Sequence, residues 1–388
     1  MTTFIRRLVL PVSCEEAFRW HERVGAFQRL LPPWEPIRVL QGPANIDVGE
    51  TVILKHRLGP LPMKWVAKHT DYEFGRMFRD VQQSGPFARW EHTHRFEVES
   101  DGTHVLIDKV DYSLPLGPIG RLFGGRFVRD KLEALFDFRH RVTYQDLSLH
   151  QDCSQTSRHF AITGSSGLVG TALCALLTTG GHRVTRMVRR DPQAETECRW
   201  DPTGDTPWEF PEDVDVVVHL AGESIASGRW TDLRKQRIVE SRVQGTKTVC
   251  EQLAHGPAKP KVLITASAIG IYGNRGDSWL DEKASMGDGF LASLVRDWEA
   301  ATHAAEAAGI RVVQGRLGIV LSTKGGALQK MLTPFRLGGG GRIGHGRQFW
   351  SWISLNDAIG AILYLATKSD VAGPVNLVGP DPLTNREF

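Results

Sequence analysis

The sequence predicts an α/β chain in which a doubly wound parallel sheet follows a smaller α+β domain. Three observations support this fold class. At 388 residues, the chain is too long for one ordinary hydrophobic core. Up to about residue 150, apolar and polar residues alternate in short segments, as they do in antiparallel strands. From residue 158 onward, short apolar runs alternate with helical segments, which is typical of a parallel sheet covered on both faces.

Residues 1–150 are expected to form a strand, short helical segments, a run of strands and one long helix. The segment CEEAFRWHERVGAFQRLLPP fits a short helix that ends at Pro32-Pro33. From Arg121 to about Tyr144, apolar residues recur at helical spacing, so we expect an amphipathic helix that packs on the sheet. The strands are expected in the alternating segments Thr51–His56, Lys64–His69, Arg89–Glu99 and His104–Tyr112.

This order of elements resembles the START-like, polyketide-cyclase-like helix-grip superfamily. The resemblance implies a ligand-binding domain over residues 1–150, with an apolar ligand enclosed between sheet and helix. Four aromatic residues could line such a cavity or simply fill the core: Trp65, Phe87, Trp90 and Phe96. His92 and His94 alternate on one face of a strand, but no third ligand is evident in the sequence. We therefore predict no metal site and expect both histidines at the surface or in a cavity lining.

Residues 151–157 are polar and lack periodicity, so we expect a linker before a second domain over 158–388. That domain opens with the strand RHFAITG and a helix through Leu177. The elements expected next are strands 183–190 and 214–222, helix 231–255, strand 261–268, helix 290–308 and strand 311–321. Near the end, Thr384 or Asn385 fits the cap of a further helix. We expect this domain to be truncated there and its last residues to be poorly anchored.

The segment FAITGSSGLVG joins a β-branched strand to a glycine-rich turn at the start of a helix. Gly164 allows a tight turn, Gly167 lets the backbone approach a pyrophosphate, and Gly170 permits close packing of helix on strand. Amide groups at the helix start would then face the phosphate charge. The motif predicts a Rossmann-type dinucleotide-binding domain. The predicted contacts are Gly164, Ser165, Ser166, Gly167, Leu168, Val169 and Gly170.

The spacing TGxxGxxG resembles the extended short-chain dehydrogenase/reductase superfamily. HLAG (219–222), SAIGIYG (267–273) and WISLNDAIGAIL (352–363) match segments of that superfamily. RWTDLRKQRIVESRVQGTKTV, RLGIVLS and GGRIGHGRQFWSW are similar to its atypical NAD(P)-dependent epimerase/dehydratase-like branch, whose members often carry a helix-grip domain in front. The resemblance covers residues 158–388 and implies an epimerase-like oxidoreductase. It adds Leu220, Ala221 and Gly222 to the expected cofactor contacts.

The end of the second strand bears on the choice of cofactor. Arg189 and Arg190 lie there, and guanidinium groups suit the 2′-phosphate of NADP through charge-assisted hydrogen bonds. Asp191 follows directly, and a carboxylate at this point can bond the ribose hydroxyls of NAD. The sequence therefore favours NADP and leaves NAD open.

The resemblance also implies a Tyr-x-x-x-Lys pair on the helix after the fifth strand, and this chain departs from it. Neither register of GFLASLVRDWEAA supplies the pair: Phe290 with Leu294, or Leu291 with Val295. An apolar side chain cannot transfer a proton. Ser267 occupies the position of the substrate-bonding serine, and Glu223 after HLAG is a candidate acid or base if the site is dry. The alternative is a catalytically silent nucleotide-binding sensor.

Four residues are candidates for contact with a small-molecule substrate, which the sequence does not identify: Arg229, Trp230, Arg316 and Arg347. A guanidinium beside an indole suits an anionic or planar ligand, and core packing of Trp230 is the alternative. Asp357 fits a helix N-cap.

Bulk properties exclude several classes of partner. The net charge of +3 argues against a nucleic-acid surface. The five cysteines have no CxxC spacing and suggest neither a zinc site nor a disulfide framework. The short apolar stretch at the N-terminus is too brief for a signal peptide or a membrane span, so we expect a cytoplasmic protein.

Overall fold

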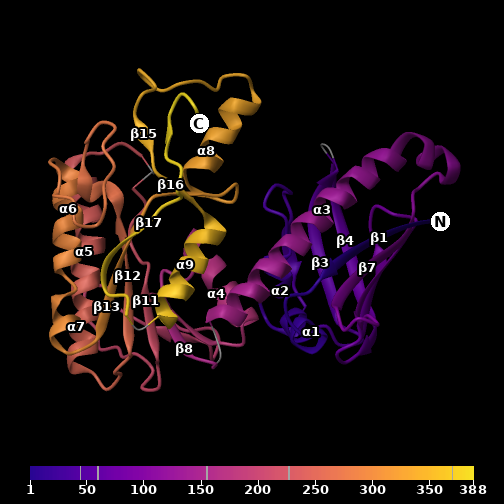
Figure 1. Cartoon of the computed structure of the whole chain (residues 1–388), viewed down its shortest axis with the longest axis horizontal. Helices are drawn as coiled ribbons and strands as arrows, with labels where there is room; N and C mark the ends of the chain where they lie inside the picture. Colours follow the sequence, from indigo (N-terminus) through magenta and orange to yellow (C-terminus); the bar gives the residue numbers. More distant parts are fainter. Residues whose placement is uncertain (44, 59–60, 154–155, 226–227, 369) are drawn as a thin grey trace. The chain divides into compact units, whose positions relative to one another are not determined.

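The computed structural model describes residues 1–388 except 44, 59, 60, 154, 155, 226, 227 and 369, and it forms two compact units (Figure 1). Unit 1 contains Met1–Gln155 together with Thr178–Gly181. Unit 2 contains Thr156–Leu177 and His182–Phe388. The last helix of unit 1 continues to Cys153, so residues 151–153 of the predicted linker are helical. Residues 154 and 155 of that linker lie outside the described residues.

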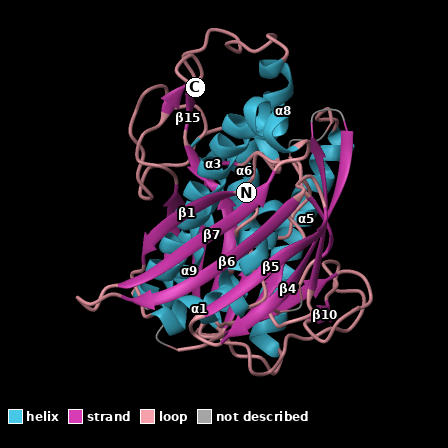
Figure 2. Ribbon diagram, turned by 90° about the vertical axis from the view of Figure 1, so that its right-hand side faces the viewer, coloured by secondary structure: helices cyan, strands magenta, loops and turns pink. Residues whose placement is uncertain are grey.

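Unit 1 is built on a seven-stranded antiparallel sheet in the order β1-β7-β6-β5-β4-β3-β2. Figure 2 shows β1, β7, β6, β5 and β4 side by side in this order. The strands are β1 Thr2–Val9, β2 Arg38–Gln41, β3 Thr51–Leu58, β4 Leu61–Glu73, β5 Met77–Ser84, β6 Arg89–Val98 and β7 His104–Ser113. The four predicted strands are confirmed as parts of β3, β4, β6 and β7, whereas β2 and β5 were not predicted.

The helices of unit 1 are α1 Cys14–Glu22, α2 Ala26–Arg29 and α3 Gly117–Cys153. The single short helix predicted here is in fact two, because Gly25 adopts φ +103° between them. Helix α3 extends beyond the predicted segment at both ends and lies across the strands (Figure 1). Its buried Leu132 and Phe136 pack with Trp90, Val110 and Tyr112 of the sheet.

The aromatic residues predicted as cavity lining or core take part in ring packing. Trp65 and Trp90 lie 5.0 Å apart between ring centroids, and Phe87 lies 4.8 Å from Trp90. Phe96 packs edge-on against Phe18 at 5.2 Å in a separate apolar cluster. These contacts support the core-filling interpretation, since aromatic pairs at such separations stabilise a sheet interior.

Unit 2 confirms the predicted Rossmann-type fold. Its seven-stranded parallel sheet has the order β10-β9-β8-β11-β12-β13-β17. Strands are added on one side of β8 up to β10 and on its other side from β11 onward, so the strand order reverses between β8 and β11. In doubly wound sheets, ligands bind beyond the carboxyl ends of the strands at this switch point. The strands are β8 His159–Thr163, β9 Arg183–Val188, β10 Glu197–Arg199, β11 Val216–His219, β12 Val262–Ala268, β13 Arg311–Leu317 and β17 Gly373–Leu377.

Helices cover both faces of this sheet, with α5, α6 and α7 on one face and α4 and α9 on the other (Figure 1). They are α4 Leu168–Thr179, α5 Asp232–His255, α6 Phe290–Ala300, α7 His303–Ala307 and α9 Leu355–Thr367. The remaining elements are η1 Ile269–Tyr272, β14 Ile319–Leu321, α8 Gly326–Arg336, β15 Phe349–Trp350, β16 Trp352–Ser354 and β18 Leu383–Thr384. In the described part of the chain, every helix is too short or too polar to span a bilayer.

Two expectations about helix ends are corrected. Asp357 is not the N-cap of α9. That position belongs to Ser354, whose hydroxyl accepts a hydrogen bond from Asp357 N at 3.0 Å and donates one to Asp357 Oδ2 at 2.7 Å. At the other end of the chain, the expected capping turn is present, since Thr384 N donates to Glu387 Oε2 at 2.8 Å. The last residues are well anchored, contrary to expectation, because Phe388 stacks on Trp350 at 5.1 Å.

Candidate functional site

The glycine turn between β8 and α4 has room for backbone only. Gly164 adopts φ +68°, and a Cβ there would lie 2.7 Å from the carbonyl carbon of Leu220. A Cβ on Gly170 would lie 2.3 Å from Gly164 O and 2.8 Å from Ser165 Cα. Real Cβ atoms do not approach backbone atoms this closely. The helix therefore sits against the turn, and the turn against the end of β11, because both glycines lack side chains.

The outer part of the turn is exposed. Gly167 and Ser166 are accessible, and Gly167 N donates to Gly164 O at 2.9 Å. Ser165 is buried, and its carbonyl oxygen accepts a hydrogen bond from Thr171 Oγ1 at 3.1 Å. Leu168 and Val169 are half-buried at the start of α4, whose first turn carries no acidic side chain. The amides of a first helical turn lack intrahelical partners, so this end of α4 suits an anion.

The end of β11 forms the opposite side of the switch point, because His219 pairs with Thr163 in register. His219 is fully buried, and its Nδ1 lies 2.7 Å from Thr163 Oγ1. Burial lowers the pKa of His219 to about 4, so the imidazole is neutral near pH 7. The predicted contacts Leu220 and Ala221 follow directly, and their backbone lies against Gly164, whereas the atoms nearest to Gly222 belong to the Arg242 side chain. The structural role of His219 was missed in the sequence, although the residue opens the HLAG segment.

The two arginines at the end of β9 differ in their surroundings. Arg190 binds Glu197 with two hydrogen bonds, of 2.8 and 2.7 Å, and this pairing lowers the pKa of the Glu197 carboxyl. Arg189 is exposed, and its guanidinium has no ion pair with the residues that the structure describes. Asp191 is exposed, with Oδ1 3.4 Å from Arg199 Nη1. Two guanidinium groups were predicted to bind a 2′-phosphate. Of these, Arg190 is already paired with Glu197, and Arg189 is the one available for a phosphate.

The loop after β11 places Glu223 beside a guanidinium. Glu223 Oε1 lies 3.7 Å from Arg234 Nη1, and the carboxylate side chain is 34% exposed. Its backbone is held on both sides, by Ser241 Oγ at 3.0 Å from the amide and by Arg242 Nη1 at 3.0 Å from the carbonyl oxygen. Burial lowers the pKa of Arg242 to about 10, and its guanidinium carbon lies 5.1 Å from the centre of the Trp298 ring. These arginine contacts were not predicted, because no local pattern records them.

Ser267 belongs to a buried polar row at the carboxyl ends of three neighbouring strands. Ser267, Arg316 and Asn376 occupy one register on β12, β13 and β17. Ser267 Oγ donates to Glu299 Oε1 at 2.5 Å, and Arg316 pairs with both oxygens of the same carboxylate at 2.9 and 2.8 Å. Tyr272 OH accepts from Arg316 Nη1 at 2.9 Å and donates to Asn376 Oδ1 at 2.7 Å. The ion pair raises the pKa of Arg316, which is buried and engaged within the fold rather than exposed to a substrate.

Helix α6 presents apolar side chains where the resemblance implies a proton-transfer pair. A Cβ on Gly270, in the 3₁₀ helix η1 that follows β12, would lie 3.5 Å from Leu291 Cβ and 4.0 Å from Val295 Cγ2. The register of Leu291 with Val295 is therefore the one that faces η1. Neither side chain can donate or accept a proton.

The remaining substrate candidates lie on two separate loops. Trp230 is 41% exposed, donates from Nε1 to Ile225 O at 3.2 Å, and packs its ring 5.7 Å from that of Phe290. Arg229 beside it is exposed, and so is Arg347 in the loop before β15. In the described part of the chain, no contact joins either guanidinium to another predicted site residue.

The strand order, the glycine turn and the helix start that follows it together define a Rossmann-type dinucleotide-binding protein. The chain belongs to the NAD dependent epimerase/dehydratase family, whose sequence model matches residues 160–378, more than half of its length. The model of the polyketide cyclase / dehydrase and lipid transport family matches residues 10–136. Both matches confirm the resemblances drawn from the sequence.

Three proteins that are similar to this chain carry related descriptions. A solved structure described as a nucleoside-diphosphate sugar epimerase from Corynebacterium glutamicum is 34% identical, with a TM-score of 0.82, over 98% of this chain and 79% of that one. The human epimerase family protein SDR39U1 (isoform 2), solved with NADPH, is 34% identical with a TM-score of 0.55, over 59% of this chain and 77% of that one. An epimerase family protein of Mycobacterium bovis is 46% identical over 59% of this chain and 75% of its own.

Proposed function

We propose that unit 2 binds NADP(H) and acts as an oxidoreductase of the epimerase/dehydratase type on an anionic small molecule. The observation that carries this proposal is the glycine turn, where Gly164 and Gly170 exclude any side chain and Gly167 leaves the backbone exposed. A bound nicotinamide dinucleotide would supply hydride transfer. The residues of the turn would hold its pyrophosphate, because amide donors at a helix start attract anions.

The choice of NADP rests on Arg189. Its exposed guanidinium suits a 2′-phosphate, whereas Arg190 already pairs with Glu197. The human relative solved with NADPH supports the same choice. Asp191 keeps binding of NAD open, so we expect a preference rather than an absolute requirement.

The proton-handling group in this proposal is Glu223. It lies on the loop beyond β11, and its Oε1 is 3.7 Å from Arg234 Nη1. Ser267 is buried, and its hydroxyl donates a hydrogen bond to Glu299, so its role would be to hold the end of β12 in place. Arg229 and Arg347 are exposed and suit the phosphates of a substrate. The description of the Corynebacterium relative makes nucleoside-diphosphate sugars the first class to test.

A second candidate function is favoured by helix α6. Leu291 and Val295 take the places of the proton-transfer pair, and this is the arrangement expected of a nucleotide-binding sensor without turnover. The two functions share the glycine turn and differ in whether the bound nicotinamide ever exchanges a hydride with a substrate.

The experiment combines cofactor binding with turnover in matched variants. NADPH and NADH are titrated by fluorescence into the full chain and into Arg189→Ala and Arg190→Ala. We expect Arg189→Ala to weaken NADPH binding about tenfold or more while leaving NADH binding unchanged, and Arg190→Ala to have the smaller effect. Reduction of NADP⁺ is then followed with a panel of nucleoside-diphosphate sugars, in which a sugar hydroxyl carbon gives a hydride to the nicotinamide and the hydroxyl proton goes to Glu223. Turnover that Glu223→Gln abolishes, with NADPH affinity retained, supports the enzyme; binding without turnover across the panel supports the sensor.

For the rest of the chain, the match to the polyketide cyclase family supports a ligand-binding role of unit 1. The domain boundaries 1–150 and 158–388, the apolar ligand and the cytoplasmic location stay predictions. Extraction of the purified full chain with organic solvent, followed by mass spectrometry, tests for a co-purified apolar ligand.

A further inference from the structure

A cluster of histidine and aspartate side chains lies inside unit 1. Asp80 on β5 pairs in register with His92 on β6. His94 follows two residues later on the same face of β6, and Asp108 on β7 pairs with it in register. His92, His94 and Asp108 are buried, and the Asp80 side chain is 19% exposed. Polar groups this deep need partners, so the contacts within the cluster are informative.

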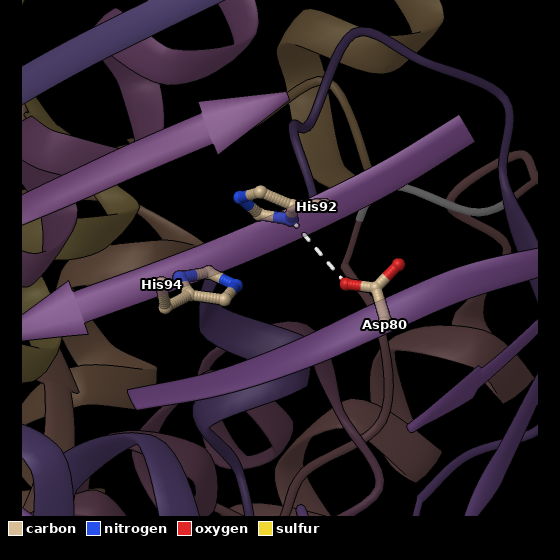
Figure 3. A group of neighbouring side chains, drawn as sticks. All are labelled: Asp80, His92 and His94. Carbon is tan, nitrogen blue, oxygen red and sulfur yellow. Dashed lines mark ion pairs between the residues drawn. The ribbon is translucent and has the colours of Figure 1, made fainter. Parts of the chain in front are cut away.

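Asp80, His92 and His94 point ligand atoms toward one another. One such atom from each residue lies within 4.8 Å of the others (Figure 3). His92 Nδ1 and Asp80 Oδ1 are 3.3 Å apart. Two ligands of a tetrahedral zinc ion, each bonded at about 2.0–2.1 Å, lie about 3.3–3.4 Å apart. This pair of donors therefore already has the separation that a metal ion requires.

Asp108 contacts the same two histidines from the other side. His92 Nε2 forms a 2.9 Å hydrogen bond with Asp108 Oδ1, and His94 Nδ1 lies 2.7 Å from that oxygen in a direction that departs from a regular hydrogen bond. His140 Nε2 of α3 bonds the second oxygen, Oδ2, at 2.6 Å. Histidines that bind metals almost always give their other ring nitrogen to a carboxylate or carbonyl, which fixes the tautomer and the ring orientation. Asp108 has this relation to both rings.

Aromatic packing holds the two imidazoles in place. Phe78 stacks on His94 with ring centroids 4.0 Å apart and an interplanar angle of 19°. Phe136 of α3 meets His92 edge-on at 5.2 Å. The ligand side chains would therefore lose little conformational freedom on binding an ion.

We propose that Asp80, His92 and His94 form a binding site for a divalent first-row transition-metal ion, with Asp108 as the residue that positions both histidines. Two imidazoles and one carboxylate are ligands typical of Zn²⁺ and Fe²⁺. Three protein ligands leave at least one position for water or a bound molecule, which is the arrangement of a reactive site rather than of a closed structural one. No third ligand beside His92 and His94 was evident in the sequence, and Asp80 supplies it.

The test uses the full chain, freed of metal by a chelator and titrated with Co²⁺ and then Zn²⁺ alone. We expect stoichiometric uptake of Co²⁺ with visible ligand-field bands, which Zn²⁺ then displaces. Asp80→Asn is the main variant because it keeps the size of a partly exposed side chain while removing a ligand charge. It should weaken binding by more than about tenfold, and Asp108→Asn, which removes the positioning carboxylate, by about 10–100-fold. Circular dichroism and thermal unfolding establish that each variant is folded.

Two control variants separate this site from adventitious binding. His255→Gln removes an exposed histidine of α5 and should leave the Co²⁺ affinity unchanged. Cys14→Ser removes the thiol that lies 3.4 Å from His104 Nδ1, a second pair of metal-ligating side chains in unit 1. The proposal is overturned if the folded chain takes up no Co²⁺, if folded Asp80→Asn binds as tightly as the parent, or if Cys14→Ser abolishes the bands.

Discussion

Gly170→Ala most severely tests the geometry of the nucleotide cradle, which is the glycine turn 164–170 between β8 and α4. In an ordinary helix, alanine is about 1 kcal/mol more favourable than glycine. At this position the new Cβ would lie 2.3 Å from Gly164 O and 2.8 Å from Ser165 Cα, and neither backbone atom can move alone. Overpacking of this kind costs about 1–3 kcal/mol. With the upper end of that range and the propensity gain subtracted, the variant should lose about 2 kcal/mol of unfolding free energy.

The assay is urea denaturation of the full chain followed by circular dichroism, with two matched glycine variants alongside. Gly245→Ala on α5 has nothing within 4 Å of the added Cβ, so it should be stabilised by up to about 1 kcal/mol. Gly167→Ala meets Gly164 O at 3.2 Å and should fold with a loss below about 1 kcal/mol, yet bind NADPH at least about tenfold more weakly. If Gly170→Ala proves as stable as the parent chain, the close contact between α4 and the turn does not exist and the cradle has another shape.

Two further predictions concern buried charge in unit 2. Burial lowers the pKa of folded His219 to about 4, whereas the unfolded chain protonates this residue near pH 6.5, so its stabilising contribution is complete above pH 6.5 and about 3 kcal/mol is lost as the pH falls toward 4. In His219→Asn, the free energy of unfolding in urea should therefore depend less on pH between pH 7 and pH 4. Glu299→Gln should lower the free energy of unfolding by about 3–5 kcal/mol in the same assay, because it leaves the Arg316 guanidinium buried without its counter-charge. The control Glu251→Gln, in an exposed pair with Lys247, should lower it by under about 1 kcal/mol, and equal effects of the two variants would contradict the buried pair.

Local patterns in the sequence were enough to predict much of the fold. The alternation in β6 and β7 and the apolar runs of β11 and β12 are properties of neighbouring residues, so a short window contains the signal. Strand β5, with the sequence MFRDVQQS, has charged and amide side chains in its middle and was missed. Its pairing with β6 is a long-range contact that no local pattern records. Missing β5 also hid Asp80, and with it the third ligand beside His92 and His94.

The candidate site divides in the same way. The glycine turn is contiguous, and its steric requirements are visible in the spacing of Gly164, Gly167 and Gly170. The partners of Arg316 and Arg190 are not visible in this way, because Glu299 lies on α6 and Glu197 on the neighbouring strand β10. A guanidinium in the sequence shows that a charge is present, and only the fold shows whether another side chain has already neutralised it.

The central claim is that the main-chain amides between β8 and α4 hold a dinucleotide. Calorimetric titration of the intact chain with NADPH, and separately with NADH, measures this directly. We predict one binding event per chain, tighter for NADPH than for NADH. The absence of binding of either coenzyme at millimolar concentration, with the protein folded, would contradict the claim.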